Sequence, residues 1–164
     1  MPKVIINSTP IISLCHLNRF DILKKLYGDI YLPEAVYSEL SAKPDSICKQ
    51  ILDDSIDEGW VHVRRINNAL AKSLYKAQLH DGEVEVMILA KEINADLVVI
   101  DDLNARKHAN YLHLNVTGTL GLLIKAKRLG YIDSLRNAFE VLLRHHIYIS
   151  EKLFHQCLKL VNED

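Results

Sequence analysis

Three short, strongly apolar segments of the chain each stop at a cluster of polar residues, and a helix-forming segment follows each cluster. The polar clusters are Asn7-Ser8-Thr9, Asp101-Asp102 and Thr117-Gly118-Thr119. Short β-branched runs that alternate with amphipathic segments predict an α/β fold around a mostly parallel sheet. The carboxyl ends of neighbouring parallel strands lie along one edge of the sheet, where ligands bind. The three clusters are therefore expected to converge.

The rest of the 164-residue chain continues this alternation. The expected strands are 4–6, 30–32, 61–66, 97–100 and 115–117. The expected helices are 10–17, 20–27, 33–43, 46–58, 69–79, 81–93, 103–112, 118–130, 133–146 and 150–161, with Ser8 or Thr9 capping the first. No repeat or low-complexity linker interrupts the pattern. We expect one domain over residues 1–164, in which 133–164 form a C-terminal helical extension.

Composition narrows the choice of function only slightly. The formal net charge of −1 neither supports nor excludes a nucleic-acid partner, so any basic surface is local. Three widely spaced cysteines show no zinc-binding spacing, and we expect them to be reduced and mostly buried in a cytoplasmic protein. Apolar runs such as Leu120–Ile124 are too short to cross a membrane.

Two expected helices place acids beside apolar faces. Glu39 lies at the border of the buried face of "PEAVYSEL", and Glu83 shares a face with Met87 in "DGEVEVMILA". Capping is the competing interpretation for such acids, because Asp81 can cap its helix and the helix dipole favours Glu83 and Glu85 in the first turn. Asp101 and Asp102 are two adjacent carboxylates, and a single one is enough to cap the following helix.

Together, Glu39, Glu83, Asp101 and Asp102 can point into one crevice. Carboxylates gathered without a partner repel each other, and a cation removes that cost. A set of oxygen ligands suits Mg²⁺ or Mn²⁺. Zinc fits less well, because the eight histidines show no zinc-ligand spacing.

Five segments in this order resemble the PIN-domain family of α/β nucleases. They are "IINSTPIISL", "YLPEAVYSEL", "DGEVEVMILA", "VVIDDLNARKHA" and "VTGTLGLLIKAK". The resemblance covers roughly residues 3 to 132, and it is closest to PIN-like predicted nucleic-acid-binding proteins of bacteria and archaea, which are related to VapC-type toxins. It implies a three-layer fold with a central, mostly parallel sheet of four to five short strands flanked by helices.

The resemblance also implies a metal-dependent endoribonuclease that hydrolyses phosphodiester bonds of single-stranded RNA with Mg²⁺ or Mn²⁺. The implied metal positions are Asn7, Glu39, Glu83 (with Asp81 as the alternative) and either Asp101 or Asp102, which spacing does not separate. Thr9 and Thr119 are implied as hydroxyl groups beside the site, and Arg106 and Lys107 as phosphate contacts. A toxin–antitoxin pair, a small antitoxin partner and a homodimer are further implications, with no membrane association.

Asn7 departs from the family pattern, which has an acid at this position. An amide oxygen can bind Mg²⁺ but contributes no charge. Two hypotheses follow: a working ribonuclease, or a catalytically weak or inactive PIN-like module that binds nucleic acid or protein. A receiver-like phosphate-handling domain is a weaker alternative, because that class also needs acids after its first strand and no Gly-rich phosphate loop is present.

Overall fold

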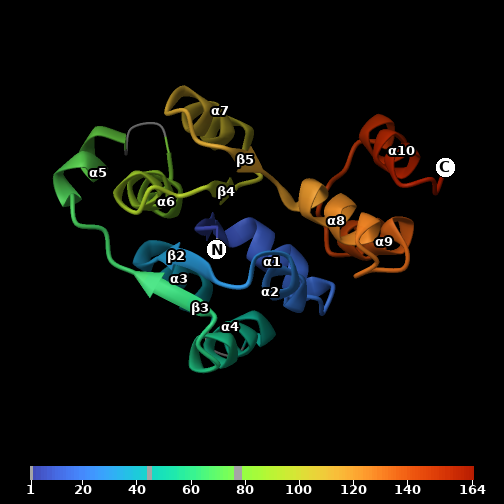
Figure 1. The fold of residues 1–164 in the computed structure, drawn as a ribbon, viewed down its shortest axis with the longest axis horizontal. Helices are drawn as coiled ribbons and strands as arrows, with labels where there is room; N and C mark the ends of the chain where they lie inside the picture. The colour runs from blue at the N-terminus through green and yellow to red at the C-terminus, as the bar shows by residue number, and fades with distance from the viewer. Residues whose placement is uncertain (1, 44–45, 76–78) are drawn as a thin grey trace.

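A parallel β-sheet forms the centre of the computed structural model, which describes residues 2–43, 46–75 and 79–164 (Figure 1). In this described part the sheet has five strands in the order β3-β2-β1-β4-β5, and every pairing is parallel. The strands are β1 (Val4–Ile6), β2 (Ile30–Pro33), β3 (Val61–Arg64), β4 (Leu97–Val99) and β5 (Val116–Thr117). The predicted α/β class and the parallel sheet are confirmed.

Helices follow or connect the strands, as the alternating pattern predicts. They are α1 (Ser8–His16), α2 (Asp21–Tyr27), α3 (Glu34–Ser41), α4 (Ile47–Asp57), α5 (Ala69–Tyr75), α6 (Asp81–Glu92), α7 (Leu103–Tyr111), α8 (Thr119–Arg128), α9 (Leu135–Arg144) and α10 (Glu151–Leu160). The predicted helix at 69–79 matches α5 as far as Tyr75, and its residues 76–78 lie outside the described part. Among the described helices, none is both long and apolar enough to cross a membrane.

Two capping predictions are wrong. The N-cap residue of α6 is His80, and Asp81 is the first residue of that helix. The N-cap residue of α1 is Asn7, in extended backbone conformation, and not Ser8 or Thr9, which are the first two residues of the helix. The Asn7 side chain makes no capping hydrogen bond to α1. Pro10 in the first turn explains part of this, because proline has no backbone N–H for a cap to bind. The side-chain amide of Asn7 is therefore available for another role.

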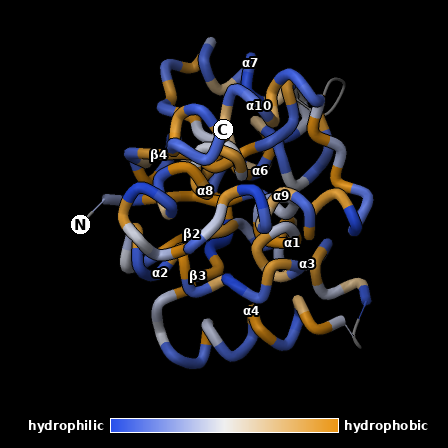
Figure 2. The backbone as a smooth tube through the Cα atoms, turned by 90° about the vertical axis from the view of Figure 1, so that its right-hand side faces the viewer, coloured by the Kyte–Doolittle hydropathy of each residue, from blue (hydrophilic) through white to orange (hydrophobic). Residues whose placement is uncertain are grey.

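The core lies between the sheet and its covering helices. All three residues of β1 are buried, and so is every residue of α6 from Gly82 to Ala90. This helix packs against α3, α5 and the strands β1 and β2, so no side of its middle faces water. Figure 2 shows hydrophobic stretches of the chain toward the middle of the molecule and hydrophilic ones at its periphery. Helix α6 therefore holds its first turn in a fixed place against the sheet.

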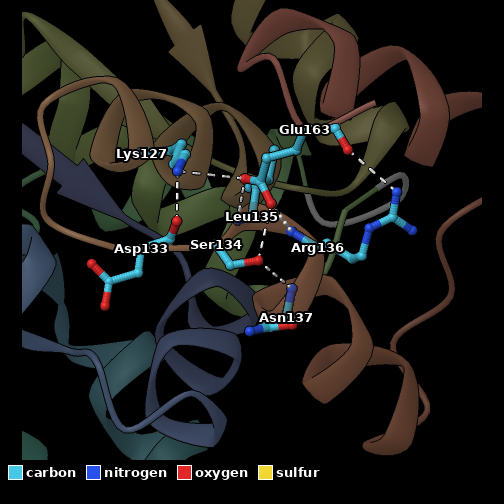
Figure 3. A network of polar contacts seen from close by, with 7 residues as sticks. All are labelled: Lys127, Asp133, Ser134, Leu135, Arg136, Asn137 and Glu163. Carbon is cyan, nitrogen blue, oxygen red and sulfur yellow. Dashed lines mark hydrogen bonds and ion pairs between the residues drawn. The ribbon is translucent and has the colours of Figure 1, made fainter.

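Helices α8, α9 and α10 pack on one another at one end of the molecule (Figure 1). Glu163, beyond α10, folds back onto the start of α9 (Figure 3). Its carboxylate accepts hydrogen bonds from the Leu135 amide at 2.6 Å, the Arg136 amide at 3.2 Å and the Ser134 hydroxyl at 2.9 Å. These bonds satisfy amides that the first turn of a helix leaves without partners. We call this contact the Glu163 clasp.

Candidate functional site

The strand order reverses direction between β1 and β4, which makes their carboxyl ends a topological switch point. From β1 the chain builds outward to β2 and β3 on one side, and β4 and β5 complete the other side. Ile6 is paired with Val99, and the backbone N–H of Asn7 donates a hydrogen bond to the Val99 carbonyl at 3.0 Å. Crevices at such points are where open parallel sheets bind ligands. Asn7, after β1, and Asp101, after β4, both lie at this edge.

The Asn7 side chain is buried but unsatisfied. Only 5% of the residue is exposed, and its Oδ1 atom makes no hydrogen bond with the described residues. A buried polar atom left in this state costs about 1–3 kcal/mol. The first turn of α6 lies next to it: a Cβ atom placed on Gly82 would be 3.6 Å from Asn7 Oδ1 and 3.1 Å from Glu39 Oε2. The structure thus brings the Asn7 and Glu39 oxygens to the same glycine.

Gly82 and Glu39 line a cleft of about 940 Å³ between α3, α5 and the start of α6. Other polar residues line it as well: Glu34, Ser38, Lys72, His80, Asp81 and Glu85. Glu39 and Glu34 are exposed, so their carboxylates face water as well as the cleft. The cleft is accordingly acidic, with its carboxylates contributed by α3 and α6.

Glu85 and Lys72 form a contact in this cleft that sequence analysis did not assign. Glu85 is 7% exposed, and its carboxylate accepts hydrogen bonds from the Ala35 amide at 3.2 Å and from Lys72 Nζ at 2.6 Å. The hydrogen bond to Glu85 raises the pKa of the Lys72 amine, although burial opposes the rise. The sequence showed Glu85 as a first-turn acid of α6, and nothing in the sequence links it to a lysine 13 residues earlier.

Glu83, whose metal role stays a prediction, makes a capping contact at the start of α6. It is buried, and its Oε2 atom accepts a hydrogen bond from the His80 amide at 3.1 Å. This contact satisfies an amide at the start of α6, as in a capping box. Glu83 does not line the cleft that contains Glu39. The capping interpretation of the first-turn acids therefore describes Glu83 in this structure.

Asp101 belongs to a second polar group at the same sheet edge. Its carboxylate accepts hydrogen bonds from the Thr119 amide at 2.7 Å and from the Thr119 hydroxyl at 2.6 Å. Gly118 permits this approach, because a Cβ atom there would lie 2.7 Å from Asp101 Oδ1 and 3.2 Å from Arg106 Nη1. The structure thus brings together Asp101, Thr119 and Arg106, three of the residues singled out by sequence.

The remaining predicted residues, Thr9, Asp102 and Lys107, are exposed on the surface. Asp102 is exposed and caps α7, accepting a hydrogen bond from the Ala105 amide at 2.9 Å. Its neighbour Asp101 instead faces the start of α8, so the structure separates two residues that spacing does not. Thr9 and Lys107 are exposed on α1 and α7.

The donor atoms present fit a weakly held, largely hydrated divalent cation. Among the described residues, no group of three or more His, Cys, Asp or Glu side chains is gathered closely enough to hold a metal ion. Asn7 Oδ1 and Glu39 Oε2 nevertheless supply two oxygens beside one glycine, and the amide oxygen lacks any other partner. Mg²⁺ usually keeps several waters and takes one or two carboxylates from a protein. The unpartnered amide oxygen is the observation that favours this fit.

Comparisons with known proteins agree with this architecture. The PilT N-terminus domain protein SSO1118 from the hyperthermophilic archaeon Sulfolobus solfataricus P2 has a similar fold, with a TM-score of 0.57 and 22% sequence identity over 76% of this chain and 92% of that chain. No curated protein matches the chain. A family model described as PIN domain matches residues 3–163. The chain therefore belongs to the PIN-domain family.

Proposed function

We propose that the protein is a divalent-metal-dependent ribonuclease that hydrolyses phosphodiester bonds of single-stranded RNA. PIN domains are commonly nucleases and generally use divalent metal ions, which supports the reaction class. The observation that carries the proposal is the buried Asn7 Oδ1 atom, without a partner and beside Glu39 at the edge of an acidic cleft. Mg²⁺ or Mn²⁺ is the cofactor of choice for these oxygen donors.

The residues of the chain divide between holding the cation and arranging its surroundings. Asn7 and Glu39 would hold it directly. Asp101, fixed by Thr119, would accept hydrogen bonds from waters around it, and Glu83 would keep the first turn of α6 in place. A bound divalent ion lowers the pKa of a coordinated water and neutralises charge on phosphate oxygens.

Arg106 is the proposed phosphate contact. Its guanidinium lies against Gly118 beside Asp101, which puts a permanent positive charge at the sheet edge where the substrate would lie. Lys107, exposed one residue further along α7, is proposed to contribute a weaker contact. The Asp102 carboxylate, exposed at the start of the same helix, is proposed to contribute charge without binding the cation directly.

Replacing Glu39 by glutamine tests the proposal. Glutamine keeps the shape of the side chain but removes its charge. Mutations of residues that only support a metal ligand reduce activity by up to about a hundredfold. Because Glu39 is proposed to bind the cation directly, cleavage of single-stranded RNA in Mn²⁺ is expected to fall by at least that factor. The measurement is the initial rate of cleavage of an end-labelled oligonucleotide. Glu140→Gln, the same change on the exposed surface of α9, serves as the control and is expected to leave the rate unchanged. Equal rates in all three proteins would exclude the proposed site.

A second candidate function is a PIN-like module that binds nucleic acid or protein without cutting it. The amide at position 7 favours it, because one carboxylate fewer reduces the charge that holds a cation. Isothermal titration of Mn²⁺ and fluorescence anisotropy with labelled RNA separate the two functions. Binding of RNA without heat from Mn²⁺ and without cleavage would establish the module in place of the nuclease.

We also propose that the protein is the toxin of a toxin–antitoxin pair and that it forms a homodimer. Exposed apolar side chains of α9, α10 and the segment between them support a partner surface: Leu143, Tyr148, Leu153 and Leu160 are all at least 40% exposed. Two other apolar residues of α10, Cys157 and Leu158, are buried against the protein itself. Light scattering of the purified chain is expected to give twice the monomer mass, and Leu160→Glu is expected to restore the monomer. A wild-type monomer would contradict the homodimer.

A further inference from the structure

Lys72 places a positive charge among the carboxylates of the cleft. Its Nζ atom lies 2.6 Å from Glu85 Oε2 and 3.9 Å from Asp81 Oδ2, and Glu34 and Glu39 line the same cleft. Among the described residues that line the cleft, Lys72 is the only lysine or arginine. The side chain is contributed by α5, whereas the carboxylates come from α3 and α6.

The contact is largely withdrawn from water. The side chains of Lys72 and Glu85 are 24% and 9% exposed. A carboxylate this deeply buried needs a compensating charge, since removing one partner of a buried pair leaves an uncompensated ion. The other Glu85 oxygen is held by the Ala35 amide in the first turn of α3. Glu85 is thus fixed between α3 and α6, and Lys72 is the cation that neutralises it.

A divalent cation in this cleft would meet that ammonium. Like charges that share a small, partly desolvated space weaken each other's binding. The ammonium also satisfies carboxylate charge that would otherwise attract the cation. The buried Asn7 Oδ1 atom, near Gly82, keeps its ligand position open. The cleft therefore contains a resident positive charge, and the open Asn7 oxygen lies next to Gly82, which lines the same cleft.

We propose that Lys72 is a built-in competitor of the divalent cation, a tethered counter-ion that neutralises Glu85 and Asp81 and thereby sets a low metal affinity for the cleft. The inference rests on the proposed function, because it assumes that a divalent cation binds beside Asn7 and Glu39. It assigns to Lys72 and Glu85 a role in regulating that site. Neither residue touches the substrate in this proposal, so both act through electrostatics and positioning.

Isothermal titration of the full chain with MnCl₂ tests this role. Lys72→Gln keeps hydrogen-bonding groups near Glu85 but removes the charge, and Lys72→Met removes both. Each variant is expected to bind Mn²⁺ about tenfold more tightly than the wild type, as expected when one partly screened like charge is removed. Lys72→Arg keeps the charge and is expected to match the wild type. Melting curves provide a second readout, since tighter binding gives a larger Mn²⁺-induced rise of the melting temperature.

The chain offers a matched control in Lys49, whose Nζ atom also lies 2.6 Å from a carboxylate oxygen, that of Asp53 on α4. Its side chain is 28% exposed, close to that of Lys72, but it does not line the cleft. Lys49→Met is therefore expected to leave Mn²⁺ affinity unchanged. A merely structural role for Lys72 would lower the melting temperature without tightening Mn²⁺ binding.

The possible outcomes separate the two proposals. Equal or weaker Mn²⁺ binding by Lys72→Gln, in a wild type that does bind Mn²⁺, would overturn the role of Lys72 and leave the metal centre standing. Absence of Mn²⁺ binding by the wild type and by both charge-removing variants would overturn both. If Lys72→Met does not fold, Lys72→Gln alone decides.

Discussion

An aspartate in place of Asn7 is expected to tighten Mn²⁺ binding and to make the metal-free protein less stable. The side chain is 5% exposed and its Oδ1 atom is without a hydrogen-bond partner, so a carboxylate there would be a buried and uncompensated charge. Such a group raises its own pKa or destabilises the fold, and a bound cation removes that cost. The gain in Mn²⁺ affinity should reach at least about tenfold, which corresponds to about 1.4 kcal/mol.

Melting curves with EDTA and with excess Mn²⁺, combined with isothermal titration, check both halves of this expectation. The variant should melt below the wild type in EDTA and gain more from Mn²⁺ than the wild type does. Asn110→Asp, the same chemical change at an exposed position on α7, should show neither effect. A variant that is destabilised in EDTA and not rescued by Mn²⁺ would show that position 7 does not face the cation.

Removal of the Glu163 carboxylate by alanine is expected to lower the free energy of unfolding by about 2–4 kcal/mol, because hydrogen bonds to charged groups contribute about 1.5–3 kcal/mol each and are not additive. The change strips the Leu135 and Arg136 amides and the Ser134 hydroxyl of their common acceptor. Lys127, 3.9 Å from the carboxylate, loses its counter-charge (Figure 3). Urea unfolding of both proteins at neutral pH gives the difference.

The effect should depend on pH in a defined direction. Burial acts to raise the pKa of the Glu163 carboxyl, but hydrogen bonds from the α9 amides and the Ser134 hydroxyl lower it more, so the pKa lies below its usual value. A carboxyl with a lowered folded-state pKa stabilises the fold above its unfolded pKa, and the contribution is lost as pH falls through the folded value. The difference in the free energy of unfolding between wild type and Glu163→Ala is therefore largest at neutral pH and becomes smaller below about pH 4.3. Glu140→Ala, exposed on α9 itself, should show no comparable loss. Similar losses in the two variants would contradict a specific role of the clasp.

Local patterns predicted the sheet edge well. Strand ends marked by Asn7, Asp101 and Thr119 do lie along one edge, because short β-branched runs followed by helix-forming segments leave few other arrangements. The strand order that places β1 beside β4 was not part of the prediction, since it depends on which helices cover which face.

Side-chain partners across elements could not be predicted in the same way. The Lys72–Glu85 pair joins α5 to α6 through packing that no local spacing encodes. Glu83 stays a predicted metal ligand, and the structure adds a hydrogen bond from the His80 amide to its carboxylate. Adjacent acids such as Asp101 and Asp102 look alike in sequence, and only their distance from the α7 and α8 amides separates them.

The burial of α6 on every side has a mechanical consequence for the cleft. Since Gly82 to Ala90 are enclosed by the sheet and two helices, the wall that contains Gly82 and Glu85 cannot shift without disturbing the core. The opposite walls belong to α3 and α5, which have exposed faces. Any widening of the cleft to admit a larger ligand therefore comes from movement of α3 and α5, while α6 stays in place.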